Sequence, residues 1–466
     1  MNKRQTVNMC DGPIFKNIVR YAVPLILTGL LQLLYNAADI IVVAKWAGGT
    51  ALAAVGSNGA LINLIVNDFV GLSVGASVIV SRFYGAEDKK NLHESVHCAM
   101  SLSIICGVIT LVIGLMVSRP ALVLMSTPDD VIGQATTYLR IYFLGMPAFM
   151  IYNFGAAILR AVGDTKRPLY ILMASGLVNV ILNLILVIGF HMDVEGVAIA
   201  TLTSQVISAV AVVVCLMRTN DVYKFEFRKL RLYPQKLVAM LRNGIPAGIQ
   251  GSIFSISNIL IQSSVNSFGS AVVSGNAAAA NVEGFVYVAM NSLHHTCLAF
   301  MSQNIGAGKF ERLSKIFKTC IIIVIVVGLV VGGTVFIFGE QLMSLYTAAS
   351  GADQSILPED IVKYGMNRLE IICTMYFLCG IMDVLVGALR GMGSPWMPMI
   401  VSIVGVCGIR ITWIYTVFRF YTTPESLYVS YIVSWLVTAS VHFICYIVVS
   451  KKFRTITKNT DLGIIN

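Results

Sequence analysis

The stretch LLQLLYNAADIIVVAKW, residues 30–46, places one carboxylate inside an otherwise apolar run. Asp39 has no basic residue nearer than Lys45, and its nearest polar neighbours along a helix are Asn36 and Gln32. A charged side chain at the centre of a bilayer-spanning helix costs about 2.5–3.5 kcal/mol on insertion scales, and intramembrane carboxylates mark ion or substrate pathways. The stretch therefore predicts a membrane helix that carries a functional group.

The composition of the whole chain also indicates a membrane protein. Of 466 residues, 57% are hydrophobic and 12% are charged, and the mean hydropathy is +0.80, whereas an ordinary soluble domain is about 25% charged. The first apolar stretch, from Ile18 to Trp46, is too long for a signal-peptide core of roughly 7–15 residues, so we expect no cleavable signal peptide. The ten cysteines form no C-x-x-C pair, and we expect them to be small buried side chains.

Twelve segments are long and apolar enough to cross a bilayer core, which needs roughly 20 residues of helix. They lie near residues 16–46, 52–82, 92–118, 134–161, 168–190, 195–217, 237–267, 275–304, 312–338, 362–391, 396–420 and 427–450. The fold class expected is therefore an all-α integral membrane protein with twelve transmembrane helices.

The basic residues predict the orientation of these helices. Both ends of the chain and every second loop between the segments carry 26 of the 33 Lys and Arg residues, whereas the opposite loops are sparse or acidic. Because basic loops stay in the cytoplasm, we expect both termini to be cytoplasmic. The net charge of +10 is then a topology signal, and we expect no nucleic-acid partner.

The two halves of the chain resemble each other. YAVPLILTGLLQLLYN (21–36) aligns with NGIPAGIQGSIFSISN (243–258), and LRAVGD (159–164) with LRGMGS (389–394). Two six-helix halves of the same orientation form a parallel repeat, with an expected substrate cavity between the lobes near the bilayer midplane. The predicted domains are an N-lobe at 1–217, a basic cytoplasmic linker at 218–242, a C-lobe at 243–450 and a cytoplasmic tail at 451–466.

With these repeats and motifs, the chain resembles the multidrug and toxic compound extrusion (MATE) family over essentially its whole length. The motifs that carry the resemblance are YNAAD (35–39), YGAEDKKNL (84–92), LRAVGDTKRP (159–168), NIGAGKFERL (304–313) and ALRGMGSP (388–395). The resemblance implies two pseudo-twofold-related six-helix bundles in a V shape. It also implies export of amphiphilic, often cationic compounds, driven by inward movement of protons or sodium ions. We expect a cofactor-free monomer in a prokaryotic cell membrane, where its partners are lipids and small-molecule drugs or metabolites.

The resemblance also implies a cation site in the N-lobe, because Asp39 matches an aspartate of that site on helix 1. The predicted coupling residues are Asp39, Asn36, Asn153, Asn179, Asn183 and Thr201, with sodium expected at Asp39, Asn179 and Asn183. Some family members carry a second aspartate where Asn183 stands, so this chain has one proton acceptor fewer. Packing amides in a helix bundle are the alternative for the asparagines.

Further polar residues are candidates for substrate binding or for coupling in the C-lobe. They are Asp383, Glu283, Tyr287, Asn291, Gln32 and Asp68. Asp383 aligns with Asn153 across the repeat, and an ion pair with Arg390 is its structural alternative. Glu283, Tyr287 and Asn291 share one helix stripe, which offers either a carboxylate and an aromatic face to a cationic drug or a packing ladder of hydrogen bonds.

Other functions remain alternatives. The sequence HESVH (93–97) fits a zinc-protease pattern, but it opens a helix beside a charged loop, and no third ligand is visible. A flippase or exporter of a lipid-linked or other endogenous metabolite is a second alternative. It is disfavoured because the membrane segments hold few basic residues, and we expect Arg140, Arg368 and Arg410 to lie near helix ends. A channel fits a two-lobed repeat less well than a carrier does.

Overall fold

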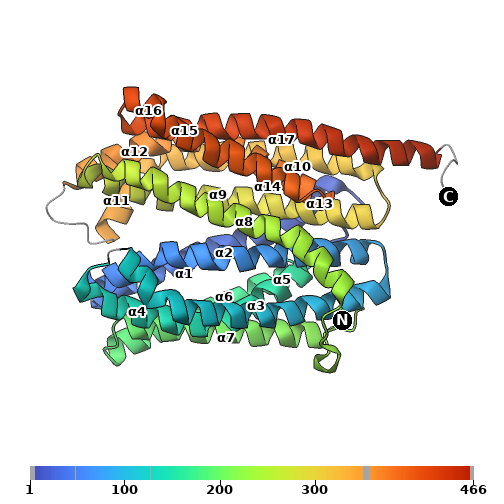
Figure 1. Ribbon diagram of the computed structural model, residues 1–466, viewed down its shortest axis with the longest axis horizontal. Helices are drawn as coiled ribbons and strands as arrows, with labels where there is room; N and C mark the ends of the chain where they lie inside the picture. Colours follow the sequence, from blue (N-terminus) through green and yellow to red (C-terminus); the bar gives the residue numbers. More distant parts are fainter. Residues whose placement is uncertain (1–5, 48, 126, 350–356, 462–466) are drawn as a thin grey trace. The chain divides into compact units, whose positions relative to one another are not determined.

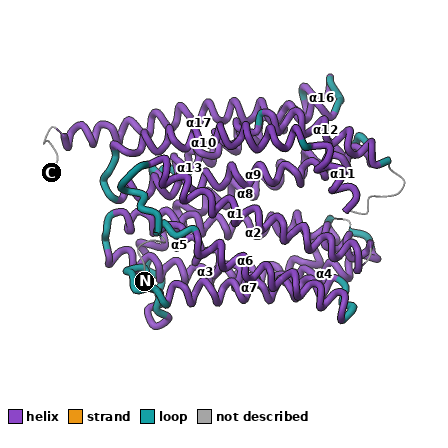
Figure 2. Tube along the Cα trace, turned by 180° about the vertical axis from the view of Figure 1, so that it is seen from behind, coloured by secondary structure: helices purple, strands orange, loops and turns teal. Residues whose placement is uncertain are grey.

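The computed structural model describes residues 6–47, 49–125, 127–349 and 357–461. These residues form helices and connecting loops, and no β-strand occurs among them (Figure 2). The helices of the first half are α1 (Ile14–Val42), η1 (Val43–Ala47), α2 (Gly49–Gly85), α3 (Lys89–Leu124), α4 (Asp129–Leu144), α5 (Met146–Ala161), α6 (Lys166–Asn183), η2 (Leu184–Gly189) and α7 (Val194–Met217).

A short 3₁₀ turn, η3 (Phe227–Lys229), lies in the linker between the two halves. The helices of the second half are α8 (Pro234–Asn266), α9 (Ser270–Gly306), α10 (Glu311–Ile337), α11 (Gly339–Ala349), α12 (Pro358–Thr374), α13 (Tyr376–Gly391), α14 (Trp396–Ser402), η4 (Ile403–Gly408), α15 (Ile409–Tyr415), α16 (Val417–Phe420) and α17 (Pro424–Asp461). Figure 1 labels most of these elements.

The predicted membrane spans correspond to these helices. Within the described chain, nine helices are individually long and apolar enough to cross a membrane, and two bent helix pairs raise the number to eleven. The twelfth span is α9, which has 37 residues but buries many polar side chains, among them Asn276, Glu283 and His294. The class is thus an all-α membrane protein with twelve spans, as the sequence predicts.

The internal repeat extends to irregularities of the helices. The pair α4 and α5 bends by 47°, and the pair α12 and α13 bends by 48°. The breaks fall at Gly145 and Met375, which are 230 residues apart, the same offset that relates LRAVGD to LRGMGS. Pro147 explains the first break, because proline removes a helical hydrogen bond; the second break contains no proline. Each half also has a π-helical turn, η2 or η4, in its fifth span.

Contacts divide the chain into two compact units, each a bundle of nearly parallel helices (Figures 1 and 2). Among the described residues, unit 1 holds Leu27–Ser252 with residues 6–7, and unit 2 holds Asn8–Ile26 and the chain from Ile253 onward. The division cuts α1 and α8 within their length, whereas the predicted lobes were separated at the linker 218–242. The lobe boundaries stay a prediction.

Glycines allow α2 to pack directly against the first half of α8 within unit 1. A Cβ atom on Gly71 would lie 2.2 Å from the backbone nitrogen of Gly248, and one on Gly75 would lie 2.2 Å from the carbonyl oxygen of Met240. Such distances are below any van der Waals contact, so only glycine permits this approach. The G-x-x-x-G spacing of Gly71 and Gly75 is typical of helices that pack this closely in membranes.

We expect the substitution Gly71→Ala to destabilise unit 1 strongly, because the added methyl group meets rigid backbone atoms of α8. Gly59→Ala is a matched control in the same helix, since a Cβ atom there meets nothing within 4 Å. Thermal unfolding in detergent should show a lower apparent Tm for Gly71→Ala than for Gly59→Ala. Equal apparent Tm values for the two variants would contradict the packing.

Candidate ion and substrate sites

Asp39 belongs to a polar cluster inside unit 1. Its Oδ1 atom accepts a hydrogen bond from Asn183 Nδ2, on α6. The same Nδ2 group donates to Asn179 Oδ1 at 3.4 Å, and both asparagines are buried. The structure therefore brings together the three side chains predicted to hold sodium, and their role as ion ligands stays a prediction.

Two π-helical turns adjoin this cluster. The turn η1 begins at Val43, shortly after Asp39, and η2 begins at Leu184, directly after Asn183. A π-helical turn displaces backbone hydrogen bonds from their α-helical partners and is frequent at functional sites. The carboxylate and the amide thus lie next to the points where their helices are most easily deformed.

Unit 1 also contains buried oxygen acceptors that have no hydrogen-bond partner in the structure. They include Asn183 Oδ1, and Thr201 Oγ1 on α7, a helix that packs against α6 and η2. Leaving a buried acceptor unsatisfied costs about 1–3 kcal/mol. Carboxylate, amide and hydroxyl oxygens are the ligands that a hard cation prefers, so these atoms can accept a cation or a proton donor.

Two tyrosines of α4 extend the cluster and were missed by the sequence analysis. Tyr138 lies close enough to Asp39 to interact with it electrostatically. Its ring stacks on Tyr142 with centroids 6.2 Å apart and 15° between the planes. Their spacing of four residues in a membrane segment was the available signal, but sequence alone does not show which way this helix face points.

The structure does not join the other predicted residues of unit 1 to this cluster through hydrogen bonds that we observe. Gln32 and Asn36 on α1 and Asp68 on α2 are exposed at the surface of the unit. Asn153 is half-buried, and its Nδ2 group donates to the carbonyl of Phe149 in its own helix at 2.9 Å. A role for these four side chains stays a prediction.

In unit 2, Asp383 lies on α13 and faces α9. Its main-chain carbonyl accepts from His294 Nδ1 at 2.8 Å, and the phenolic hydroxyl of Tyr287 lies within electrostatic range of the carboxylate. Asp383 Oδ2 is buried and has no hydrogen-bond partner in the structure. Tyr287 is 45% exposed and Asn291 is half-buried, so this stripe reaches the surface of the unit.

Glu283 is engaged by a residue that the sequence analysis did not assign to it. Arg368 Nε donates to Glu283 Oε1 at 2.7 Å and Arg368 Nη2 donates to Oε2 at 2.8 Å. A third bond runs from Arg368 Nη1 to Asn276 Oδ1 at 2.7 Å. Both charged side chains are 8% exposed. The carboxylate predicted to meet a drug is thus held in a bidentate buried ion pair, and Arg368 is not near a surface.

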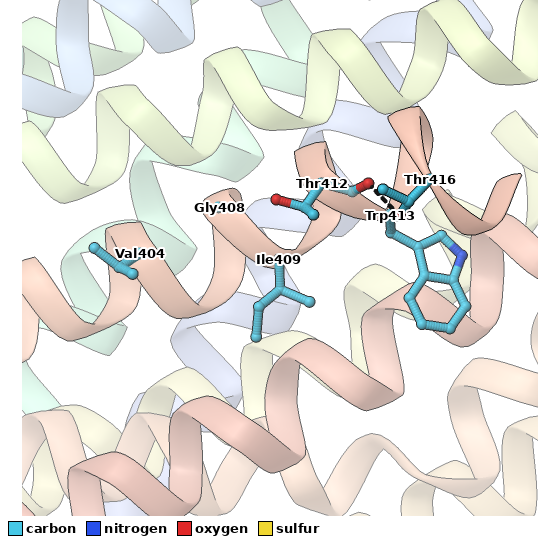
Figure 3. A pocket seen from close by; sticks show the side chains of 6 residues that line it. All are labelled: Val404, Gly408, Ile409, Thr412, Trp413 and Thr416. Carbon is cyan, nitrogen blue, oxygen red and sulfur yellow. Dashed lines mark hydrogen bonds between the residues drawn. The ribbon is translucent and has the colours of Figure 1, made fainter. Parts of the chain in front are cut away.

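A pocket of about 380 Å³ lies on unit 2 along η4 and α15. Its walls are Val404, Gly408, Ile409, Thr412, Trp413 and Thr416 (Figure 3). Thr416 Oγ1 donates to the carbonyl of Thr412 at 2.6 Å. No ionisable side chain lines this pocket, so it does not contain the carboxylates predicted for the substrate site.

The second histidine of HESVH, His97, makes structural contacts with the linker. His97 Nε2 accepts from the backbone N–H of Glu226 at 3.0 Å, and its ring lies against Phe225 with centroids 5.5 Å apart. The acceptor nitrogen of His97 is therefore hydrogen-bonded to the linker and is not available to a metal ion. Among the described residues, no three His, Cys, Asp or Glu side chains form a group that could hold a metal ion.

We accordingly expect the purified protein to contain no stoichiometric zinc, as measured by elemental analysis. His97→Ala should destabilise the protein by about 1 kcal/mol, because it leaves the partly buried N–H of Glu226 without an acceptor. His93→Ala should cost less, since His93 makes no such contact with the linker. Bound zinc that is lost equally in both variants would contradict this interpretation.

These helices and buried polar clusters define an all-α, multi-pass membrane protein with twelve spans. The MatE family model matches residues 24–185 and 246–416. The chain therefore belongs to the MatE family of multidrug efflux transporters.

Individual relatives agree with this assignment. The chain is 29% identical over 406 residues to "Probable multidrug resistance protein YoeA" of Bacillus subtilis, with 85% of this chain and 86% of that protein covered. It is 21% identical to the multidrug export protein MepA of Staphylococcus aureus, with 84% of this chain and 85% of that protein covered. Its fold matches a MOP superfamily transporter from Pyrococcus furiosus with a TM-score of 0.89 at 23% identity, covering 97% and 100% of the two chains.

Proposed function

We propose that this protein is a secondary active antiporter that exports amphiphilic, cationic organic compounds in exchange for inward protons or sodium ions. The observation that carries the proposal is the cluster of Asp39, Asn183 and Asn179, a carboxylate inside a membrane bundle without a basic partner among its hydrogen bonds. The printed names of the relatives, which describe multidrug resistance and export, support the substrate class.

The mechanism that we infer is alternating access. Removal from water favours the neutral form of a carboxylate, whereas a bound cation favours its charged form. Asp39 then takes up a proton or a sodium ion from outside, and the drug replaces that ion from inside. Ion and drug each shift the populations of the inward- and outward-open states, because each binds one state better than the other. The unsatisfied oxygens of Asn183 and Thr201 are the further ligands that we assign to the ion.

We further propose that the protein acts as a monomer in a prokaryotic cell membrane, with both termini in the cytoplasm. The positive-inside distribution of 26 basic residues supports the orientation, and the bacterial relatives support the membrane.

Reconstitution in lipid vesicles tests the proposed coupling. The purified protein is inserted into vesicles, a proton gradient or a sodium gradient is imposed separately, and transport of the cationic dye ethidium is followed by fluorescence. One of the two gradients should drive ethidium uphill, and the matching ionophore should stop it. Transport that neither gradient accelerates over protein-free vesicles would overturn the antiport proposal.

A further inference from the structure

Unit 2 contains a buried arginine side chain that has no role in the proposed transport cycle. Arg410 on α15 is 5% exposed. Its Nε group donates to Ser434 Oγ at 3.0 Å, and its guanidinium carbon lies 3.9 Å from the centroid of the Tyr431 ring and 6.0 Å from that of Trp435. All three partners lie on α17, so the guanidinium points into the unit.

The charges around Arg410 do not balance. The Tyr431 ring also lies 5.5 Å from the guanidinium of Arg368, so one tyrosine contacts two arginines. The carboxylate of Glu283 is already taken by Arg368 in a bidentate pair. The salt bridges found among the described residues involve Arg167, Lys229, Lys309 and Arg368 but not Arg410. The cluster therefore has two guanidinium groups and one carboxylate.

The contacts that Arg410 makes do not replace an anion. Arginine stays protonated in proteins and has five N–H donors, of which the Nε donor bonds to a neutral hydroxyl. A cation–π contact contributes about 2 kcal/mol when it is desolvated, whereas a buried charge without a counterion costs several kcal/mol. The two terminal nitrogens make no hydrogen bond to an acceptor among the described residues, and neither is completely enclosed, although the residue is only 5% exposed. A group of the size of a water molecule can therefore touch them.

The surroundings of the guanidinium are aromatic. The rings of Tyr376 and Trp435 have centroids 5.2 Å apart, and those of Tyr431 and Trp435 have centroids 5.9 Å apart. A planar guanidinium fork matches the two oxygens of a carboxylate, and the flat rings beside it suit an aromatic body. A carboxylate attached to an aromatic ring satisfies both features at once.

We propose that Arg410 forms an anion subsite in unit 2 that binds the carboxylate of an aromatic organic acid. The terminal nitrogens of Arg410 donate to the two carboxylate oxygens, and Tyr431 and Trp435 hold the guanidinium in place from one side. This inference rests on the proposed export function and extends it, because it adds carboxylate-bearing aromatic compounds to the substrates of the exporter.

Equilibrium dialysis of the purified full-length protein in detergent tests this subsite, with protein-free micelles as the blank. The probes are 2-naphthoate and 2-naphthamide, which share the aromatic body but differ in charge. The wild type should bind naphthoate more tightly than naphthamide. Arg410→Gln should weaken naphthoate binding by roughly 10- to 100-fold and leave naphthamide binding unchanged. Arg140→Gln, an exposed arginine of unit 1, should change neither.

Equal binding of the two probes by the wild type, or a preference for naphthoate that survives in Arg410→Gln, would overturn the subsite. If Arg410→Gln does not fold, Arg410→Lys replaces it, and its loss of the bidentate fork should still lower naphthoate affinity. Naphthoate should also raise the apparent Tm of the wild type and not that of the Arg410 variant. The dialysis assay uses no ion gradient, so its result does not depend on ion-driven transport. The anion subsite can therefore be disproved while the antiport proposal holds, and the antiport proposal can be disproved while the subsite holds.

Discussion

Vesicles that contain the Asp39→Asn variant are expected to show no ethidium transport driven by an ion gradient. Asparagine has almost the shape of aspartate, and its oxygen can still accept the hydrogen bond from Asn183 that Asp39 accepts. The variant therefore keeps its packing but loses the charge that a proton or sodium ion must neutralise. Transport should fall to the level of protein-free vesicles, as measured by ethidium fluorescence under the gradient that drives the wild type.

Asp129→Asn is the matched control for this prediction. Asp129 is an exposed carboxylate in the first turn of α4, outside the polar cluster, and the control variant should transport at the wild-type rate. Size-exclusion elution and apparent Tm confirm that both variants are folded. Wild-type export by Asp39→Asn under the same gradient would disprove the role assigned to this carboxylate.

The substitution Glu283→Gln is expected to have the largest effect on stability. It leaves the guanidinium of Arg368 buried without its counterion, and breaking a buried ion pair in this way costs about 3–5 kcal/mol. Replacing both partners, as in Glu283→Leu with Arg368→Met, removes both charges and should be less destabilising than Glu283→Gln alone. Thermal unfolding in detergent should rank the apparent Tm values in that order.

Glu340→Gln provides the control for the ion pair, since Glu340 is exposed at the start of α11. It should leave the apparent Tm near that of the wild type. An apparent Tm of Glu283→Gln equal to that of Glu340→Gln would show that the carboxylate is not needed to neutralise Arg368.

The sequence predicts much of the fold because membrane crossing depends on length and apolarity, which are read directly from the chain. Every predicted span has a helical counterpart, and the break between α4 and α5 has a visible cause in Pro147. The break at Met375 has no such signal, and only the repeat relates it to the first. The π-helical turns, which depend on packing, also had no signal in the sequence.

The candidate sites were less predictable because periodicity places residues on one face of a helix without showing which neighbour that face meets. Asp39 and Asn183 are 144 residues apart, and they were paired through the family resemblance. For this reason Tyr138 was missed, and Arg368 was expected near a helix end without its contact with Glu283. The substrate cavity expected between the two lobes stays a prediction.

Ion release on drug binding tests the central claim most directly. Purified wild-type protein in weakly buffered detergent solution, or loaded with radioactive sodium, is mixed with ethidium, and the released protons or sodium ions are counted. The account predicts that ethidium releases one of the two ions from the wild type and from Asp129→Asn, and neither ion from Asp39→Asn. Release of the same amount of ion from Asp39→Asn, or of no ion from the wild type, would contradict it.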